Sequence, residues 1–139
     1  MTEKKQGRRS AKDAEETRFL IMSVAADMFC EHGYDSVSLR NISEKASVSH
    51  SLIRHHFGSK EKIWHAISDC LHEYFQSYIA KIVEELPKGI APNITIYLFS
   101  MRLFSNMIHS RKPMQLITDS VRQKDNLVDY FIDNVGNVE

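Results

Sequence analysis

The sequence predicts an all-α protein, with an N-terminal three-helix unit followed by a longer helical region. Its 139 residues include only 5 Gly and 3 Pro, and its apolar residues recur at the three- and four-residue spacing of amphipathic helices. The two-residue alternation typical of strands is weak, and no segment repeats. No apolar run reaches the roughly 18 residues of a membrane span, and the N-terminus lacks the apolar core of a secretory signal. We therefore expect a cytoplasmic protein without membrane contact.

The first helix is expected over residues 17–32, because its apolar residues fall on one face and Gly33 provides a C-terminal stop. Ahead of it, residues 1–14 are predicted to form a flexible basic arm. The arm is either a solvated tail or a segment that follows a phosphate backbone or enters a minor groove. A second, short helix is expected over residues 39–46, since Ser38 is a good N-cap.

A third, short helix is expected over residues 50–57, with Ser49 as its N-cap and Gly58 at its end. A fourth, long helix is predicted over residues 60–86, where apolar residues recur every four positions up to Pro87. These two helices complete the N-terminal unit and begin the longer helical region.

Two prolines suit the first turn of a helix, and they predict a fifth helix over residues 92–109 and a sixth that begins at Pro113. A seventh helix is expected over residues 126–135. From this pattern we expect a helix-turn-helix domain over residues 15–62 and a helical domain over residues 63–139.

The first three helices have the outline of a helix-turn-helix module, in which the third helix packs one face and presents the other to base edges. Ile53 and Phe57, one turn apart, supply the packed face. The other side carries hydrogen-bonding or small apolar residues, namely His50, Ser51, Leu52, Arg54 and His55. Arginine bonds phosphate or guanine, and leucine contacts the thymine methyl, so this pattern indicates DNA binding.

A longer set of residues at fixed spacing extends this interpretation. It comprises Arg18, Ile21, Ala25, Phe29, Gly33 and Tyr34, then Val37 to Ile42, Ala46 to Ser49, Ile53, Phe57, and Ser59 to Glu61. Over residues 17–66 this set closely resembles the DNA-binding domain of TetR-type transcriptional regulators, without gaps. The resemblance implies a one-component repressor that binds a palindromic DNA operator as a homodimer and is released when a small-molecule effector binds its helical C-terminal domain.

The resemblance also implies roles for single residues. Ser38 matches a capping hydroxyl that contacts phosphate, Arg40 an arginine that reaches a base or the backbone, and Lys60 a lysine that holds phosphate. With the third helix and its cap, the expected DNA-binding residues are Ser38, Arg40, Ser49, His50, Ser51, Leu52, Arg54, His55 and Lys60.

The chain departs from the family pattern in three respects. Ser47 stands where a turn glycine is usual, so a left-handed backbone there would cost energy. Arg54 and His56 replace common aromatic residues, which leaves the operator sequence open. Family members also continue into two further long helices that pair in the dimer. We expect either a truncated chain or a shortened regulator that dimerises differently, which puts the homodimer in doubt.

The second half of the chain is rich in aromatic and thioether side chains. These form an apolar effector pocket between helices, or they are plain core at helical spacing. The candidate effector-binding residues are Phe75, Tyr78, Tyr97, Met101 and Phe104. No polar group among them selects an effector class.

Two other classes of function, a metal protein and an enzyme, fit the sequence less well. Glu61, His65, Asp69 and His72 share one face of the fourth helix, which suits either a divalent metal or a row of ion pairs, and we expect no metal site. Because catalytic triads and phosphate-binding glycine loops are missing, we also expect no enzyme activity and no cofactor. The alternative to a regulator is a short interaction protein that forms mixed dimers with a full-length relative and binds little DNA alone.

Overall fold

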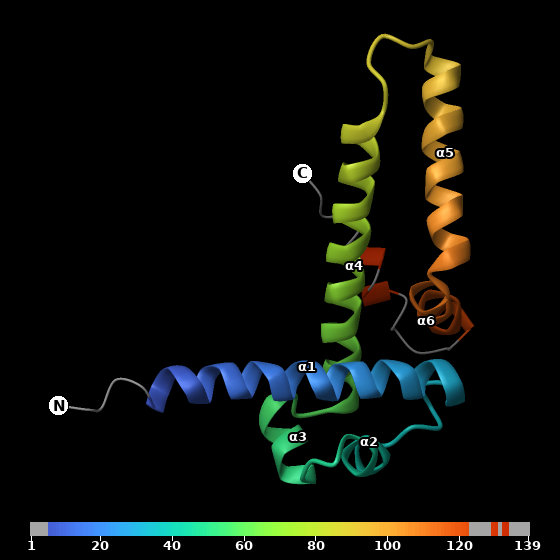
Figure 1. The fold of residues 1–139 in the computed structure, drawn as a ribbon. Coiled ribbons are helices and arrows are strands. Elements are labelled where there is room, and N and C mark those ends of the chain that lie inside the picture. Colours follow the sequence, from blue (N-terminus) through green and yellow to red (C-terminus); the bar gives the residue numbers. More distant parts are fainter. Residues whose placement is uncertain (1–5, 123–128, 131, 134–139) are drawn as a thin grey trace, which may run out of the picture. The chain divides into compact units, whose positions relative to one another are not determined.

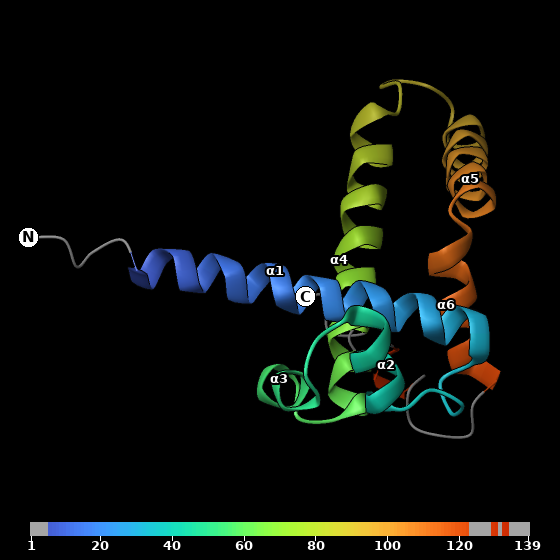
Figure 2. The same cartoon turned by 60° about the horizontal axis from the view of Figure 1, so that its bottom comes forward.

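The computed structural model describes residues 6–122, 129–130 and 132–133, and Figures 1 and 2 show the fold. The described residues form helices and turns and no strand, so the all-α prediction is confirmed. The chain divides into two compact units, Met1–Ile67 (unit 1) and Ser68–Glu139 (unit 2). The helices are α1 Gln6–His32, α2 Leu39–Ala46, α3 His50–His56, α4 Lys60–Glu85, α5 Pro92–His109 and α6 Arg111–Arg122.

Helix α1 begins at Gln6, so the predicted start at residue 17 is wrong. The added segment contains good helix formers and no proline, and a helix continues through such residues unless a stronger signal ends it. An ion pair also spans one turn there, with Lys12 Nζ 3.6 Å from Glu16 Oε1. The helix therefore occupies most of the segment predicted as a flexible arm, and residues 1–5 lie outside the described part of the chain.

The other predicted boundaries differ little from the observed ones. Helices α2 and α5 have their predicted bounds, and α3 and α4 each end one residue early. Helix α6 begins at Arg111, which places Pro113 third in the helix, where its missing N–H is still one of the unpaired groups of a first turn. The predicted seventh helix lies mostly outside the described residues, although 129–130 and 132–133 are helical.

Unit 1 has a core to which each of its helical segments contributes. Helices α2 and α3 lie on one side of α1 in both views (Figures 1 and 2). Most of the face predicted to pack in α1 is buried, although His32 at its end is exposed. Among the most deeply buried apolar side chains are Ile21, Ala25 and Phe29 of α1, Ile42 of α2, Ile53 of α3 and Ile63 of α4.

Three aromatic rings close this core between α1 and α4. The ring centroids of Phe29 and Tyr34 lie 5.1 Å apart, and Trp64 lies 6.0 Å from Phe29 and 5.9 Å from Tyr34. Such tilted and edge-on contacts are the favoured geometry of aromatic pairs. The segment between α1 and α2 is thereby fixed to the first turns of α4.

A left-handed residue makes the turn between α2 and α3. Ser47 has φ 55° and ψ 38°, and it is the only described non-glycine residue with a positive φ. Its N–H donates to the carbonyl of Glu44 at 3.3 Å, and the N–H of Val48 donates to that of Ser43 at 3.1 Å. The turn thus provides hydrogen bonds to carbonyls in the last turn of α2. Because serine stands where glycine would adopt this backbone freely, the left-handed conformation costs some conformational energy.

Unit 2 is built on the pairing of α4 with α5, which run side by side in opposite directions (Figure 1). Tyr78 Oη donates to the carbonyl of Arg102 at 2.9 Å, and Tyr74 Oη donates to Asn106 Oδ1 at 3.2 Å. The guanidinium of Arg102 lies 3.5 Å from the carboxylate of Glu85. Within the described parts of the chain, no helix is long and apolar enough to span a membrane.

Replacing Phe29 with alanine is expected to lower the free energy of unfolding by about 3–5 kcal/mol, because the ring is fully buried and its loss leaves a cavity. Phe19, on the same helix, is 69% exposed, so Phe19→Ala should cost less than about 0.5 kcal/mol. Urea titration followed by circular dichroism measures both changes. Equal losses in the two variants would contradict the assigned core.

Replacing Ser47 with valine is expected to lower the free energy of unfolding by about 1–2 kcal/mol, since a β-branched residue is strained at a positive φ. Ser47→Gly should not lower it, because glycine adopts this backbone freely. Thermal unfolding of the two variants and the parent chain measures the difference. A Ser47→Val variant as stable as the parent would rule out the left-handed turn.

Candidate DNA interface

The N-terminus of α2 is capped by Ser38, as predicted. The N–H of Asn41 donates to Ser38 Oγ at 3.2 Å, and the N–H of Ser38 donates to Asn41 Oδ1 at 2.9 Å, which makes a reciprocal capping box. The Ser38 hydroxyl also donates to Asn41 Oδ1 at 2.6 Å. An exposed hydroxyl is thereby fixed at the positive end of α2, where a phosphate oxygen is favoured.

Arg40 projects from the first turn of α2 and is 83% exposed in its side chain. Its Nε donates to Glu44 Oε1 at 2.9 Å, one turn along the helix. A guanidinium carries five N–H donors, so this ion pair orients the group without using its whole donor capacity. With its guanidinium held by Glu44, Arg40 can still donate to a phosphate or a base edge.

Helix α3 has the two-faced character that the sequence predicts. Ile53 is fully buried, and Phe57, its C-cap, is almost fully buried. Ser49 caps the start by accepting from the N–H of Leu52 at 3.2 Å, and its Oγ lies 3.0 Å from Ser51 Oγ. The packed face thus fixes how α3 lies in unit 1, and its other face is left to solvent.

The outer face of α3 carries hydrogen-bonding groups and no carboxylate. Arg54 supplies a permanent positive charge at the surface. The exposed members of the predicted set on this helix are His50, Ser51, Arg54 and His55. Leu52 is half-buried, so it is less exposed than the sequence predicts.

Lys60 differs from the other predicted residues, because its ammonium group is already engaged within unit 1. Its Nζ donates to the carbonyl of Tyr34 at 2.9 Å and lies 4.1 Å from the centroid of the Tyr34 ring. The side chain is half-buried. Lys60 therefore holds the turn after α1 against the start of α4, and its charge lies at that junction.

Besides the contact of Lys60, one more contact in this unit was not predicted from the sequence. The guanidinium carbon of Arg18 lies 4.8 Å from the ring centroid of Phe57, a cation–π contact that ties the end of α3 to α1. The spacing of residues in the sequence indicated only that Arg18 matches the TetR-type pattern, and it did not indicate what Arg18 contacts. The contact depends on the path of the chain between residues 18 and 57, and no local signal encodes that path.

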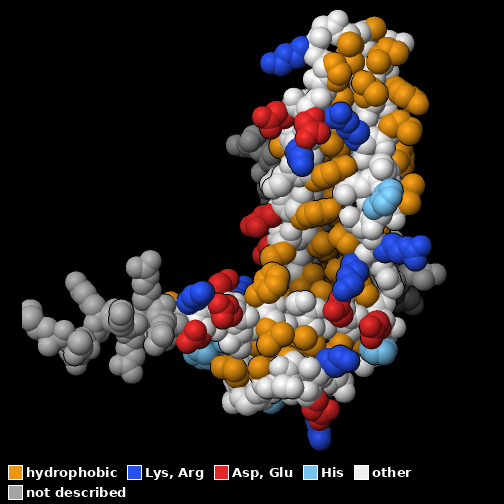
Figure 3. All heavy atoms as spheres, viewed as in Figure 1, with side chains coloured by type: hydrophobic (Ala, Val, Ile, Leu, Met, Phe, Trp, Pro, Cys, Tyr) orange, Lys and Arg blue, Asp and Glu red, His pale blue; other side chains and the backbone are white. Residues whose placement is uncertain are grey.

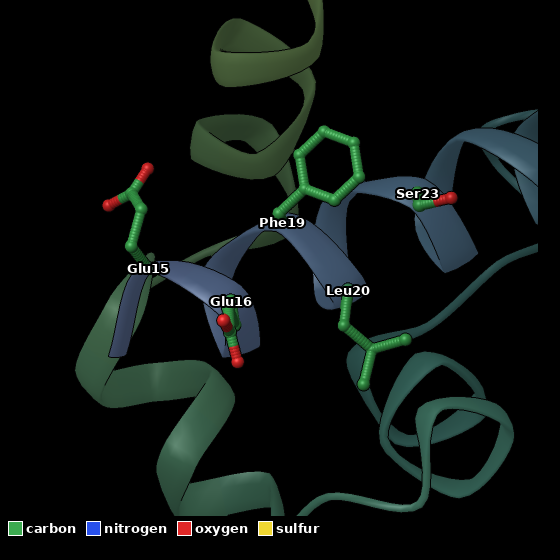
Figure 4. Close-up of a pocket in the computed structure, with 5 residues that line it drawn as sticks. All are labelled: Glu15, Glu16, Phe19, Leu20 and Ser23. Atoms are coloured by element: carbon green, nitrogen blue, oxygen red, sulfur yellow. The ribbon is translucent and has the colours of Figure 1, made fainter. Parts of the chain in front are cut away.

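The effector candidates of unit 2 do not form one buried group. Phe75 and Tyr78 are half-buried, and Tyr97, Met101 and Phe104 are exposed. Figure 4 shows a surface depression elsewhere, in unit 1, lined by Glu15, Glu16, Phe19, Leu20 and Ser23 of α1. None of the five candidates contributes to that depression. Their role as effector contacts remains a prediction.

Three of the four residues that share one face of α4 have contacts in the structure. His65 Nε2 lies 4.0 Å from Glu61 Oε1, and Asp69 Oδ1 accepts a hydrogen bond from Tyr130 Oη at 3.0 Å. Among the described residues, no group of three or more histidine, cysteine, aspartate or glutamate side chains is arranged to hold a metal ion.

Comparison with known proteins identifies the N-terminal unit. A family model of bacterial regulatory proteins, the tetR family, matches residues 21–67. An HTH-type transcriptional repressor of Mycobacterium tuberculosis is 37% identical over 57 residues, which are 41% of this chain and 30% of the relative. The HTH-type transcriptional regulator TtgR of Pseudomonas putida is 36% identical over 66 residues, 48% of this chain and 31% of the relative. The alignments thus span under a third of these two relatives.

Solved structures show the same fold at low sequence identity. The ketosteroid transcriptional regulator KstR2 of Mycobacterium tuberculosis matches with a TM-score of 0.67 and 21% identity, over 86% of this chain and 60% of that protein. NalD, the secondary repressor of a multidrug efflux pump in Pseudomonas aeruginosa, matches with a TM-score of 0.61 and 18% identity, over 89% of this chain and 61% of NalD. Residues 21–67, which hold the helix-turn-helix, are thus similar to the tetR family of bacterial regulatory proteins.

Proposed function

We propose that the chain is a transcriptional repressor that binds operator DNA through α3 and the start of α2. The observation that carries this proposal is the outer face of α3, where Arg54 and His55 are exposed beside hydroxyl and imidazole groups and no carboxylate lies on the helix. Ile53 anchors the opposite face. A rigid, carboxylate-free helix of this kind suits the major groove, where arginine and histidine donate to base edges and phosphates.

The remaining contacts position the domain on the phosphate backbone. We assign this role to Ser38, Arg40, Ser49 and Lys60, because each supplies a hydroxyl or a positive charge near a helix start in unit 1. Contacts with phosphate increase the affinity for every DNA sequence alike. The side chains of α3 add the preference for one particular DNA sequence.

Two finer parts of the proposal concern assembly and control. We infer that two copies of the chain bind a palindromic operator, because paired helix-turn-helix domains contact half-sites one DNA turn apart. We also infer that a small-molecule effector bound by unit 2 releases the DNA. The aromatic and thioether residues Phe75, Tyr78, Tyr97, Met101 and Phe104 are the proposed contacts for an apolar effector. No finding favours the alternative of mixed dimers with a longer relative.

Replacing Arg54 with alanine is expected to weaken binding to the preferred sequence about 5- to 150-fold, the cost of one lost bidentate base contact, and to change random-sequence binding much less. His55→Ala should likewise weaken binding to the preferred DNA sequence more than binding to random sequences. The preferred duplex is selected first from a random library with the parent chain, and fluorescence anisotropy then gives the dissociation constants.

Arg111→Ala is the matched control, because it removes an exposed arginine of unit 2. It should leave both dissociation constants unchanged. If Arg54→Ala and His55→Ala weakened selected and random duplexes equally, α3 would have no reading role and the proposal would fail.

Replacing Lys60 with alanine is expected to weaken binding to all duplexes alike and to reduce the slope of log affinity against log salt by about one, the effect of one lost phosphate contact. Lys60→Arg keeps the charge and should keep the slope. An unchanged slope in Lys60→Ala, with a lower melting temperature, would mean that Lys60 acts only by holding the turn at Tyr34.

A further inference from the structure

The outer face of α3 is rich in hydrogen-bond donors. Arg54 carries five N–H donors and no acceptor, and His50 and His55 each donate through at least one ring N–H. All three side chains are exposed. In Figure 3, histidine side chains lie at the surface of unit 1, on the side of α1 where α2 and α3 lie. The donors are therefore available to a molecule that contacts this face.

Hydrogen-bond acceptors are few on the same face. Helix α3 contains no Asn, Gln, Asp or Glu, which are the residue types that accept from the amino groups of adenine and cytosine. The hydroxyl of Ser51 is already hydrogen-bonded, since its Oγ lies 3.0 Å from Ser49 Oγ. A neutral imidazole offers one accepting nitrogen, and arginine offers none. The face therefore donates to a base edge more readily than it accepts from one.

The apolar residues of α3 are largely withdrawn from its outer face. They are Leu52 and Ile53, of which Ile53 is fully buried and Leu52 is half-buried. Thymine is distinguished in the major groove by its C5 methyl group, which is read through apolar contact. Helix α3 therefore presents little apolar surface to that methyl group.

Guanine is the base that best matches such a face, because it presents two acceptors, O6 and N7, in the major groove, and no other base presents two acceptors there. We propose that α3 reads guanine, with Arg54 donating to O6 and N7 of one guanine and His50 and His55 donating to guanines beside it. This inference rests on the proposed function, because it names the base that α3 selects once the helix lies in the major groove.

The test begins with the preferred duplex that the whole chain selects from a random library at low salt. The base pair read by Arg54 is the one whose preference is lost when Arg54→Ala selects from the same library. We expect guanine at this position. Because Arg54 is exposed, its variants should keep the fold, and circular dichroism checks this.

Removing N7 from that guanine tests the contact directly. 7-Deazaguanine pairs normally with cytosine but has a C–H group in place of N7. It should raise the dissociation constant of the parent chain about 2- to 12-fold, the effect of losing half the free energy of a bidentate arginine–guanine contact. The same replacement should leave the binding of Arg54→Ala unchanged, since that contact is already absent.

A substitution in the protein provides the complementary test. Arg54→Gln presents an acceptor and a donor that match adenine, so the base selected at this position should change from guanine to adenine. Arg54→Lys is the matched control, because it keeps a donor-only side chain and should keep guanine.

The outcomes separate this inference from the proposed function. Adenine, cytosine or thymine at the position read by Arg54, or an unchanged dissociation constant with 7-deazaguanine there, would overturn the guanine preference and leave DNA reading by α3 intact. An Arg54→Gln variant that still selects guanine would do the same. A library without an enriched sequence, or an Arg54→Ala variant that selects the parent's sequence, would overturn both the reading role of α3 and this inference.

Discussion

The contact on which unit 1 depends is the meeting of Phe29, Tyr34 and Trp64, with the ammonium group of Lys60 over the Tyr34 ring. The three rings fix the segment that joins α1 to α2 against the first turns of α4. Lys60 adds a hydrogen bond to the Tyr34 carbonyl at 2.9 Å, so the backbone of the turn is held as well as its side chain. Because α2 begins immediately after this segment, the cluster determines where the capping box at Ser38 and the following turn lie.

From that fixed point, three features set the direction of α3. The left-handed backbone at Ser47 makes the turn, Ile53 anchors the helix in the core, and Arg18 holds Phe57 at its end. Together they leave one face of a short helix free, with its polar groups in fixed positions. A rigid presentation of this kind reduces the conformational entropy lost when the helix meets DNA, which is the advantage of preorganised binding. The proposed reading function therefore depends on packing within unit 1 as much as on the side chains of α3.

The sequence predicted the all-α class, the bounds of α2 and α5, and the caps at Ser38 and Ser49, because these features depend on local spacing and short-range hydrogen bonds. The start of α1 was misplaced, since Gln6–Glu16 has helix-forming residues but no apolar stripe to reveal them. Spacing could not predict the engagement of Lys60 with Tyr34 or of Arg18 with Phe57, which join residues distant in the chain. In unit 2 Pro92 predicted where α5 begins, but the sequence did not predict that Tyr97, Met101 and Phe104 are exposed, because an apolar pattern does not identify what covers it.

A two-dimensional amide NMR titration of the chain with a random-sequence duplex at low salt tests whether α3 is the DNA-binding helix. Non-specific binding is strong enough under these conditions to shift amide signals. The largest shifts are expected between residues 38 and 60, with the strongest in α3 around Arg54 and His55, and the amides of α5 should hardly move. Shifts confined to unit 2, or no shifts at protein concentrations where the chain is folded, would contradict the assignment of α3 as the DNA-binding helix.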